Sequence, residues 1–327
     1  MKSKIKDSVQ EYRQLIAILG ILVFLVIFFS IIAKGFFTYN NFINLLRQLS
    51  MLGIVSTGMA MVLISGGLDL TVGSQMSLVG TVTALLIVKY QWNPLGAAVI
   101  GMVGVALCGF VNSLLINKFK MWPMIATIAM MQIIQGVCYI ISGGLPVYGL
   151  SENVKWIGQG YVAGIPVPVI IMLIVMFLGA FVLKKTYIGR YLYAVGSNEE
   201  GARLSGIKIK VVKTISYLIC ALLSGIAGLI LMGRVASGQP AGGEGMEMDV
   251  ITACVVGGIG LNGGVGNMKG GFLGVLIIGT LTNGLGVLGV GEFYQLIFKG
   301  IVLLAAVGVD CIRREKMANK KVVITEE

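Results

Sequence analysis

The feature that most constrains the fold of this chain is a succession of ten apolar runs separated by polar segments. The runs are Leu15 to Ala33, Ser50 to Ser65, Gln75 to Lys89, Leu95 to Ile116, Pro123 to Ile141, Pro166 to Leu183, Val212 to Met232, Asp249 to Leu261, Gly271 to Val290 and Tyr294 to Val309. Several are shorter than the roughly 20 residues that a helix needs to cross a bilayer core. The chain is 57% hydrophobic and 12% charged. These features predict an all-α, polytopic membrane protein with about ten transmembrane helices, some of them short or broken.

Positive charge indicates the orientation, because lysine and arginine are retained on the cytoplasmic side of a membrane. If the N-terminus is inside, 19 of the 25 basic residues fall in cytoplasmic segments. The segments 142–165 and 233–248 are then external. We expect a cytoplasmic tail at 1–14, one transmembrane domain at 15–310 with a cytoplasmic loop at 184–211, and a cytoplasmic tail at 311–327. No clear cleavage site precedes Lys34, so the first run is predicted to be a retained helix of a multi-pass protein of the inner membrane.

The chemistry that the sequence lacks excludes several classes of function. The chain has no histidine, which excludes histidine-based catalysis and the common zinc-protease motif. It has no GxxxxGK[ST] phosphate loop, so it does not hold ATP in such a loop itself. The five cysteines show no paired spacing and are interpreted as packing residues. We therefore expect no catalytic residue, metal or bound cofactor, and the scattered basic residues do not indicate nucleic acid as a partner.

The longest polar interruption, 184–213, contains a short helix with a signal at each end. In SNEEGARLSG, Ser197 is predicted as the N-cap, Glu200 as its capping-box partner, and Gly206 as the stop. Glu199 and Glu200 lie at the positive end of the helix dipole. Because an isolated helix this short is only marginally stable in water, its careful specification favours docking of another molecule on it. An ordinary solvated connector is the alternative.

Two glycine-rich segments, 64–74 and 257–271, each join two short apolar runs. Each is interpreted as either a break in a helix beside a transport cavity or a tight turn. A turn is favoured for the second segment, because Lys269 would otherwise enter the membrane. Asp69, in the first segment, is the carboxylate farthest from any predicted aqueous boundary. It either caps the helix that resumes at residue 70 or 71, or lines a pathway.

Three blocks of sequence, taken together, resemble a known family over nearly the whole chain. They are ISGGLDLTVGSQMSLVG at 64–80, IGRYLYAVGSNEEGARLSGI at 188–207, and GGIGLNGGVGNMKGGFLGVLIIGTLTNGL at 257–285. The chain resembles the permease subunits of bacterial ABC importers for ribose, xylose, galactose and related monosaccharides. The larger group also contains permeases for branched-chain amino acids and autoinducer-2.

The resemblance implies a transport subunit, which is not itself an enzyme, and three protein partners. These are a cytoplasmic ATPase that uses ATP and magnesium, an extracytoplasmic sugar-binding protein, and a second permease subunit that is identical or paralogous. The middle block corresponds to the coupling helix that docks into the ATPase. Its residues here are Ser197, Asn198, Glu199, Glu200, Ala202, Arg203, Leu204 and Gly206. Glu200 and Gly201 stand where relatives commonly have small residues, and the motif LNGGVGNMKG departs from the more usual version, so the cargo is left open among a ribose-like sugar, a nucleoside, autoinducer-2 and a branched-chain amino acid.

Polar residues within the apolar runs are the candidates for the translocation pathway. They are Ser65, Asp69, Thr71, Asn112, Gln132, Gln135 and Asn283. Hydrogen bonds that hold helices together are the alternative role for each of them. Lys299 is predicted to extend to the external interface. Two competing classes remain, which are an ion-coupled carrier that would depend on Asp69 and a membrane scaffold or receptor.

Overall fold

The computed structural model describes residues 2–325, and side chains are described for 15–309 and 311–312. The helices are α1 (Lys2–Ile32), α2 (Tyr39–Ile64), α3 (Val72–Val88), α4 (Pro94–Asn117), α5 (Pro123–Ser142), α6 (Glu152–Gln159), α7 (Val167–Lys185), α8 (Tyr187–Ser197), α9 (Glu199–Leu204), α10 (Ile209–Val235), α11 (Met246–Val256), α12 (Met268–Val287) and α13 (Glu292–Thr325). Two small antiparallel pairs join β1 (Val147–Tyr148) to β4 (Ser237–Gly238), and β2 (Tyr161–Val162) to β3 (Ile165–Pro166). The predicted all-α fold is confirmed.

Helix length divides the ten predicted runs into two groups. Within residues 15–309, eight helices are long and apolar enough to cross a membrane: α1, α2, α4, α5, α7, α10, α12 and α13. In contrast, α3 has 17 residues and α11 has 11. The apolar run predicted at 249–261 is helical only as far as Val256. Gly257 ends the helix, and the rest of the run forms a turn. Short or broken helices are thus confirmed, and the count of ten crossings stays a prediction.

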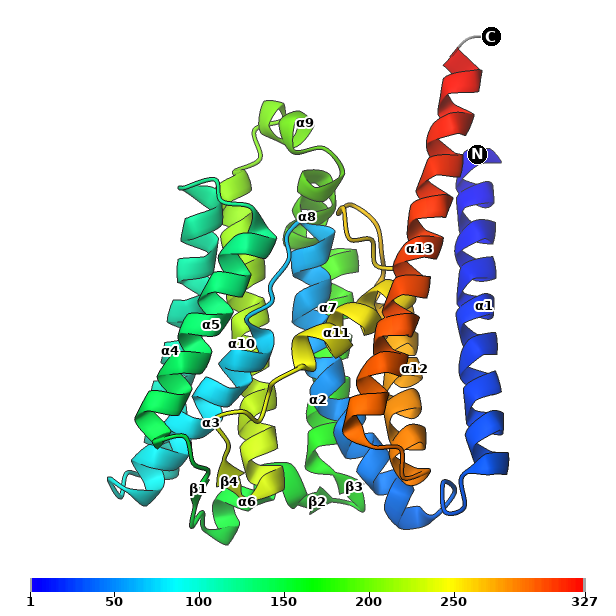
Figure 1. Ribbon diagram of the computed structural model, residues 1–327. Coiled ribbons are helices and arrows are strands. Elements are labelled where there is room, and N and C mark those ends of the chain that lie inside the picture. Colours follow the sequence, from blue (N-terminus) through cyan, green and yellow to red (C-terminus); the bar gives the residue numbers. More distant parts are fainter. Residues whose placement is uncertain (1, 326–327) are drawn as a thin grey trace.

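The two short helices both begin inside the bundle. Figure 1 shows the chain running from the end of α2 back between the helices before α3 starts, and rising from β4 before α11 starts. The two N-termini lie against each other, because the Gly243 amide donates to Ser77 Oγ at 3.0 Å. A Cβ atom on Gly73 would lie 2.3 Å from Gly243 O, so only glycine permits this approach. Gly243 is thus buried beside α3, and the assignment of 233–248 to the external side stays a prediction.

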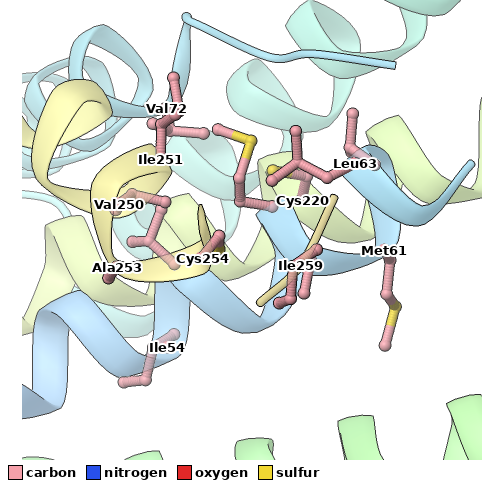
Figure 2. Close-up of a cluster of buried hydrophobic side chains, with 14 of the residues drawn as sticks. Ile54, Met61, Leu63, Val72, Cys220, Val250, Ile251, Ala253, Cys254 and Ile259 are labelled. Atoms are coloured by element: carbon pink, nitrogen blue, oxygen red, sulfur yellow. The ribbon is translucent and has the colours of Figure 1, made fainter. Parts of the chain in front are cut away.

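The core is centred on α2, because 89% of the residues in an apolar 18-residue stretch of this helix are buried. Figure 2 shows α11 lying across α2. The thiol of Cys254 on α11 lies 3.6 Å from Ser56 O on α2. Cys254 and Cys220 are fully buried among aliphatic side chains, and both are free thiols. Small side chains at these points let α2, α10 and α11 approach closely, which supports a packing role for these cysteines.

The outer helices expose apolar side chains, as lipid contact requires. The exposed residues of α4 and α7 include Val103, Leu107, Phe177 and Leu178. The first residues of α1 and the last of α13 lie at the same end of the bundle as α9 (Figure 1). The two tails predicted at 1–14 and 311–327 continue α1 and α13 as helix where the structure describes them. The described ends of the chain, residues 2 and 325, thus lie at the same end of the bundle as the long loop, and the assignment of that end as cytoplasmic stays a prediction from the basic residues.

Candidate functional site

The short helix in the long loop is present, but its N-cap is one residue later than predicted. Ser197 is the last residue of α8, and Asn198 is the N-cap of α9, where its Oδ1 accepts from the Gly201 amide at 2.9 Å. Asparagine caps as well as serine does, so the serine and glutamate spacing gave a false capping box. Glu200 instead pairs with Arg203 at 2.5 Å, and its carboxylate raises the pKa of that guanidinium.

The C-terminal stop at Gly206 is confirmed. Its φ of +80° is the left-handed conformation that glycine adopts freely. Its amide donates to Arg203 O at 3.0 Å, and the Ile207 amide donates to Ala202 O at 3.0 Å. These two bonds are the Schellman pattern, which satisfies the last carbonyls of the helix. The end of α9 is thus held rigidly although the helix has only six residues.

The exposed face of α9 offers an apolar contact flanked by charge. Leu204 is 79% exposed, whereas Ala202 is buried against the protein. Glu200 and Arg203 are both more than 60% exposed, at 63% and 66%. Glu199 reaches back to Lys213 of α10 at 2.7 Å, which ties the helix to the bundle. An exposed leucine on a fixed helix offers apolar surface that gains free energy when a partner protein buries it.

The helix α8 connects α9 to the centre of the bundle. Tyr193 Oη donates to Gly266 O at 2.7 Å, in the glycine-rich turn 257–267. A Cβ atom on Gly196 would lie 1.9 Å from Ile64 O and 2.6 Å from Gly264 N. The Gly264 amide also donates to Ile64 O at 2.8 Å. The three blocks that carry the family resemblance therefore meet at one point, where the ends of α2 and α8 contact the glycine-rich turn. We call this contact the glycine junction.

Asp69 belongs to a buried cluster of hydrogen-bonded polar side chains just before and within the first turn of α3. Its Oδ1 accepts from the Thr71 amide at 3.0 Å and from Thr71 Oγ1 at 2.5 Å. Asn112 and Gln75 each donate an amide hydrogen to Thr71 Oγ1, at 2.9 and 2.7 Å. Asp69, Thr71, Gln75 and Asn112 are all fully buried. The prediction that Asp69 caps a helix starting at residue 70 or 71 is wrong, because α3 begins at Val72 with Thr71 as its N-cap and no side-chain cap; Asp69 instead holds the turn before it. Three of the predicted pathway residues, Asp69, Thr71 and Asn112, are brought together.

The other candidates for the pathway lie apart from this cluster. Ser65 is buried 3.4 Å from Ser216 on α10, and Asn283 exchanges hydrogen bonds of 3.0 and 2.9 Å with Asn41 on α2. Both contacts join helices. Gln135 donates to Pro240 O at 2.7 Å, and Gln132, one turn earlier on α5, is exposed. The predicted pathway residues therefore do not form a single constellation.

Two acidic residues inside the bundle were not singled out from the sequence. Glu247 is buried in the first turn of α11, near the N-terminus of α3. Asp249, two residues further on, forms an ion pair of 2.7 Å with Lys299 of α13. The predicted extension of Lys299 to the external interface is therefore wrong, because a carboxylate within reach binds its ammonium group inside the bundle. The signal available in the sequence was the acidic pair at the start of a run too short to span the membrane.

Replacing Lys299 by methionine is expected to lower the free energy of unfolding by about 2 kcal/mol, because Asp249 would keep its charge without a partner. The pair is about a fifth exposed, at 20% and 19%, so hydration limits the loss. Thermal unfolding in detergent measures it. The double variant Lys299→Met with Asp249→Leu is expected to recover most of the stability. A double variant as unstable as the single one would show that the ion pair is not the cause.

The amino-acid sequence is similar to a family of membrane permeases and to several sugar permeases. Residues 41–307 match the family described as branched-chain amino acid transport system / permease component. A ribose import permease protein of Bacillus subtilis (strain 168) is 44% identical over 288 residues, covering 88% of this chain and 89% of the relative. An L-arabinose transport system permease protein of Escherichia coli (strain K12) is 38% identical over 93% of this chain and 92% of the relative. A xylose transport system permease protein of Haemophilus influenzae is 33% identical over 95% and 98%.

No solved structure matches the chain. The match over residues 41–307 covers the bundle from α2 into α13, the glycine junction and α9. The identity with three sugar permeases extends over most of each chain. The chain therefore belongs to the family of permease components of the branched-chain amino acid transport system type.

Proposed function

We propose that this chain is the transmembrane permease subunit of an ATP-driven ABC importer that carries a ribose-like monosaccharide across the bacterial inner membrane. The observation that carries the proposal is α9, a rigidly capped helix with an exposed leucine, fixed through α8 to the glycine junction. The names of the relatives, which are ribose, arabinose and xylose permeases, support the sugar. ATP and magnesium belong to the partner ATPase, and an extracytoplasmic binding protein delivers the cargo.

Contacts from α9 through α8 to the glycine junction provide a route by which motion of the ATPase reaches the transmembrane helices. When the ATPase closes on ATP, a partner that holds Leu204 moves α9 as a unit, because the helix is locked at both ends. The motion passes along α8 to the glycine junction, where the end of α2 and the turn 257–267 are in backbone contact. That turn joins α11 to α12, and the end of α2 leads into α3, so both short helices, α3 and α11, are linked to the motion. Packed elements transmit such a displacement as rigid bodies, which suits alternating access.

The test replaces Leu204 by aspartate in the complex with its ATPase. We expect the affinity for the ATPase to fall about 30-fold, since a buried interface anchor contributes about 2 kcal/mol or more. Leu204→Met is the matched control and is expected to bind as the native chain does. Copurification and ATP-dependent uptake into vesicles are the measurements. Native affinity in the aspartate variant would count against docking through α9.

Two alternatives have specific support. The family description favours a branched-chain amino acid as the cargo. Among the described side chains Asp69 is a buried carboxylate without a cationic partner, which favours an ion-coupled carrier. Uptake measured with D-ribose, L-arabinose, D-xylose and leucine separates the cargoes. Uptake that continues without ATPase and stops when the proton gradient is dissipated would indicate the carrier.

A further inference from the structure

One outer face of the bundle is polar at the depth where a membrane is driest. It consists of Gln132 and Gln135 on α5, the non-helical segment 239–245, and the exposed side of α11, and we call it the α5–α11 face. Gln135 lies near the middle of α5 and donates to Pro240 O, which places the segment at the same depth. Figure 1 likewise shows α11 beginning partway along the bundle. On α4 and α7 the exposed residues in the middle of the helix are valine, leucine, isoleucine and phenylalanine.

Glu244 is the residue of this face for which contact with lipid is least favourable. It is exposed in the segment that precedes α11, and no ion pair to it occurs among the described side chains. A carboxylate at membrane depth costs several kcal/mol in hydrocarbon, and non-helical backbone does not contact lipid there. Both features are tolerated where the surface borders a water-filled cavity. The Asp249 to Lys299 pair, partly exposed beside it, has the same requirement.

We propose that the α5–α11 face is one wall of the translocation pathway and that Glu244 binds hydroxyl groups of the sugar, which rests on the proposed function. A carboxylate accepts hydrogen bonds from two neighbouring hydroxyls, and the Gln132 amide both donates and accepts. Met248, 49% exposed on α11, offers an apolar contact for the carbon face of the ring. These side chains match a neutral polyhydroxylated solute.

The opposite wall is a second copy of this chain or its paralogue. With two-fold symmetry the same face occurs on both sides of the axis, so two Glu244 carboxylates border one path. The α5–α11 face of each subunit is then covered by the same face of the other subunit and does not contact lipid. A single chain leaves the wall open to lipid, so a water-filled path needs both subunits.

Thiol labelling tests the wall. In a background with Cys108 and Cys311 replaced by serine, Glu244→Cys is compared with Phe177→Cys, which lies on the apolar exposed side of α7. The complete importer in proteoliposomes is treated with a charged thiosulfonate that does not enter lipid. We expect labelling at residue 244, with loss of uptake, and none at 177. Labelling at 244 by a lipid-soluble maleimide alone would place the face in lipid and overturn the proposal.

Transport kinetics test the contact with sugar. Glu244→Ala is expected to raise the KM for D-ribose uptake about tenfold or more, the loss of hydrogen bonds to a charged group, whereas Glu244→Gln is milder. Copurification with the ATPase checks that each variant is folded. A native KM in Glu244→Ala would overturn the contact. A native importer that takes up none of the sugars would instead contradict the proposed function, and labelling at 244 would still decide where the pathway lies.

Discussion

Replacing Gly196 by valine is expected to abolish ATP-driven uptake. The Cβ atom would lie 1.9 Å from Ile64 O, and an ordinary contact needs about 3.5 Å, so the end of α8 must withdraw by about 1.5 Å or more. The obstructing atoms belong to backbone, which has no rotamer to escape into. We expect a loss of about 3 kcal/mol in the free energy of unfolding, the upper end of overpacking costs. The withdrawal also separates α9 from α2, so the motion of the ATPase no longer reaches the bundle.

Uptake and ATP hydrolysis, measured in the same vesicles, check this outcome. The expected result is ATP hydrolysis that continues in the assembled complex while uptake is lost. Gly136→Val is the matched control, because Gly136 lies in the helix α5 and a Cβ there has no atom within 4 Å. Gly196→Ala is expected to be intermediate and keeps the test readable if the valine variant does not accumulate. Native uptake in both Gly196 variants would show that the glycine junction transmits nothing.

Replacing Asp69 by leucine is expected to lower the free energy of unfolding by about 3 kcal/mol. The side chain is fully buried, so the Thr71 amide and the Thr71 hydroxyl would both lose their acceptor where water does not replace it. Each buried donor left unsatisfied costs about 1 to 3 kcal/mol. The apolar side chain regains part of that through burial. Thermal unfolding in detergent measures the change.

The matched variant Asp69→Asn separates the hydrogen bonds from the charge. Asparagine keeps an acceptor for Thr71 and adds a donor. Among the described residues, Gln75 Oε1 and Asn112 Oδ1 are buried oxygens without a partner, and the new amide can supply one of them. We expect stability within about 1 kcal/mol of native. If Asp69→Asn is as unstable as Asp69→Leu, the cluster depends on the negative charge itself.

Local patterns predicted the elements well. The apolar runs located the eight helices within residues 15–309 that are long and apolar enough to cross a membrane, and also the short helices α3 and α11. Gly206 marked the end of α9, because capping, like helix length, depends on neighbouring residues. The N-cap was missed by one residue. Ser197 and Asn198 both cap well. Gly196 packs against Ile64, and this contact keeps Ser197 within α8, so Asn198 becomes the N-cap of α9.

The sequence by itself determined that this chain lies in a membrane and where its helices fall, and it predicted a capped helix in the long loop. Hydrophobicity and charge act on each segment separately, so they are readable without a fold. Only the tertiary structure decided that α3 and α11 start against each other, that Lys299 binds Asp249, and that Asn283 binds Asn41, 242 residues away. These contacts depend on how distant segments pack, because a buried polar group takes the partner that the packing of the bundle brings within reach.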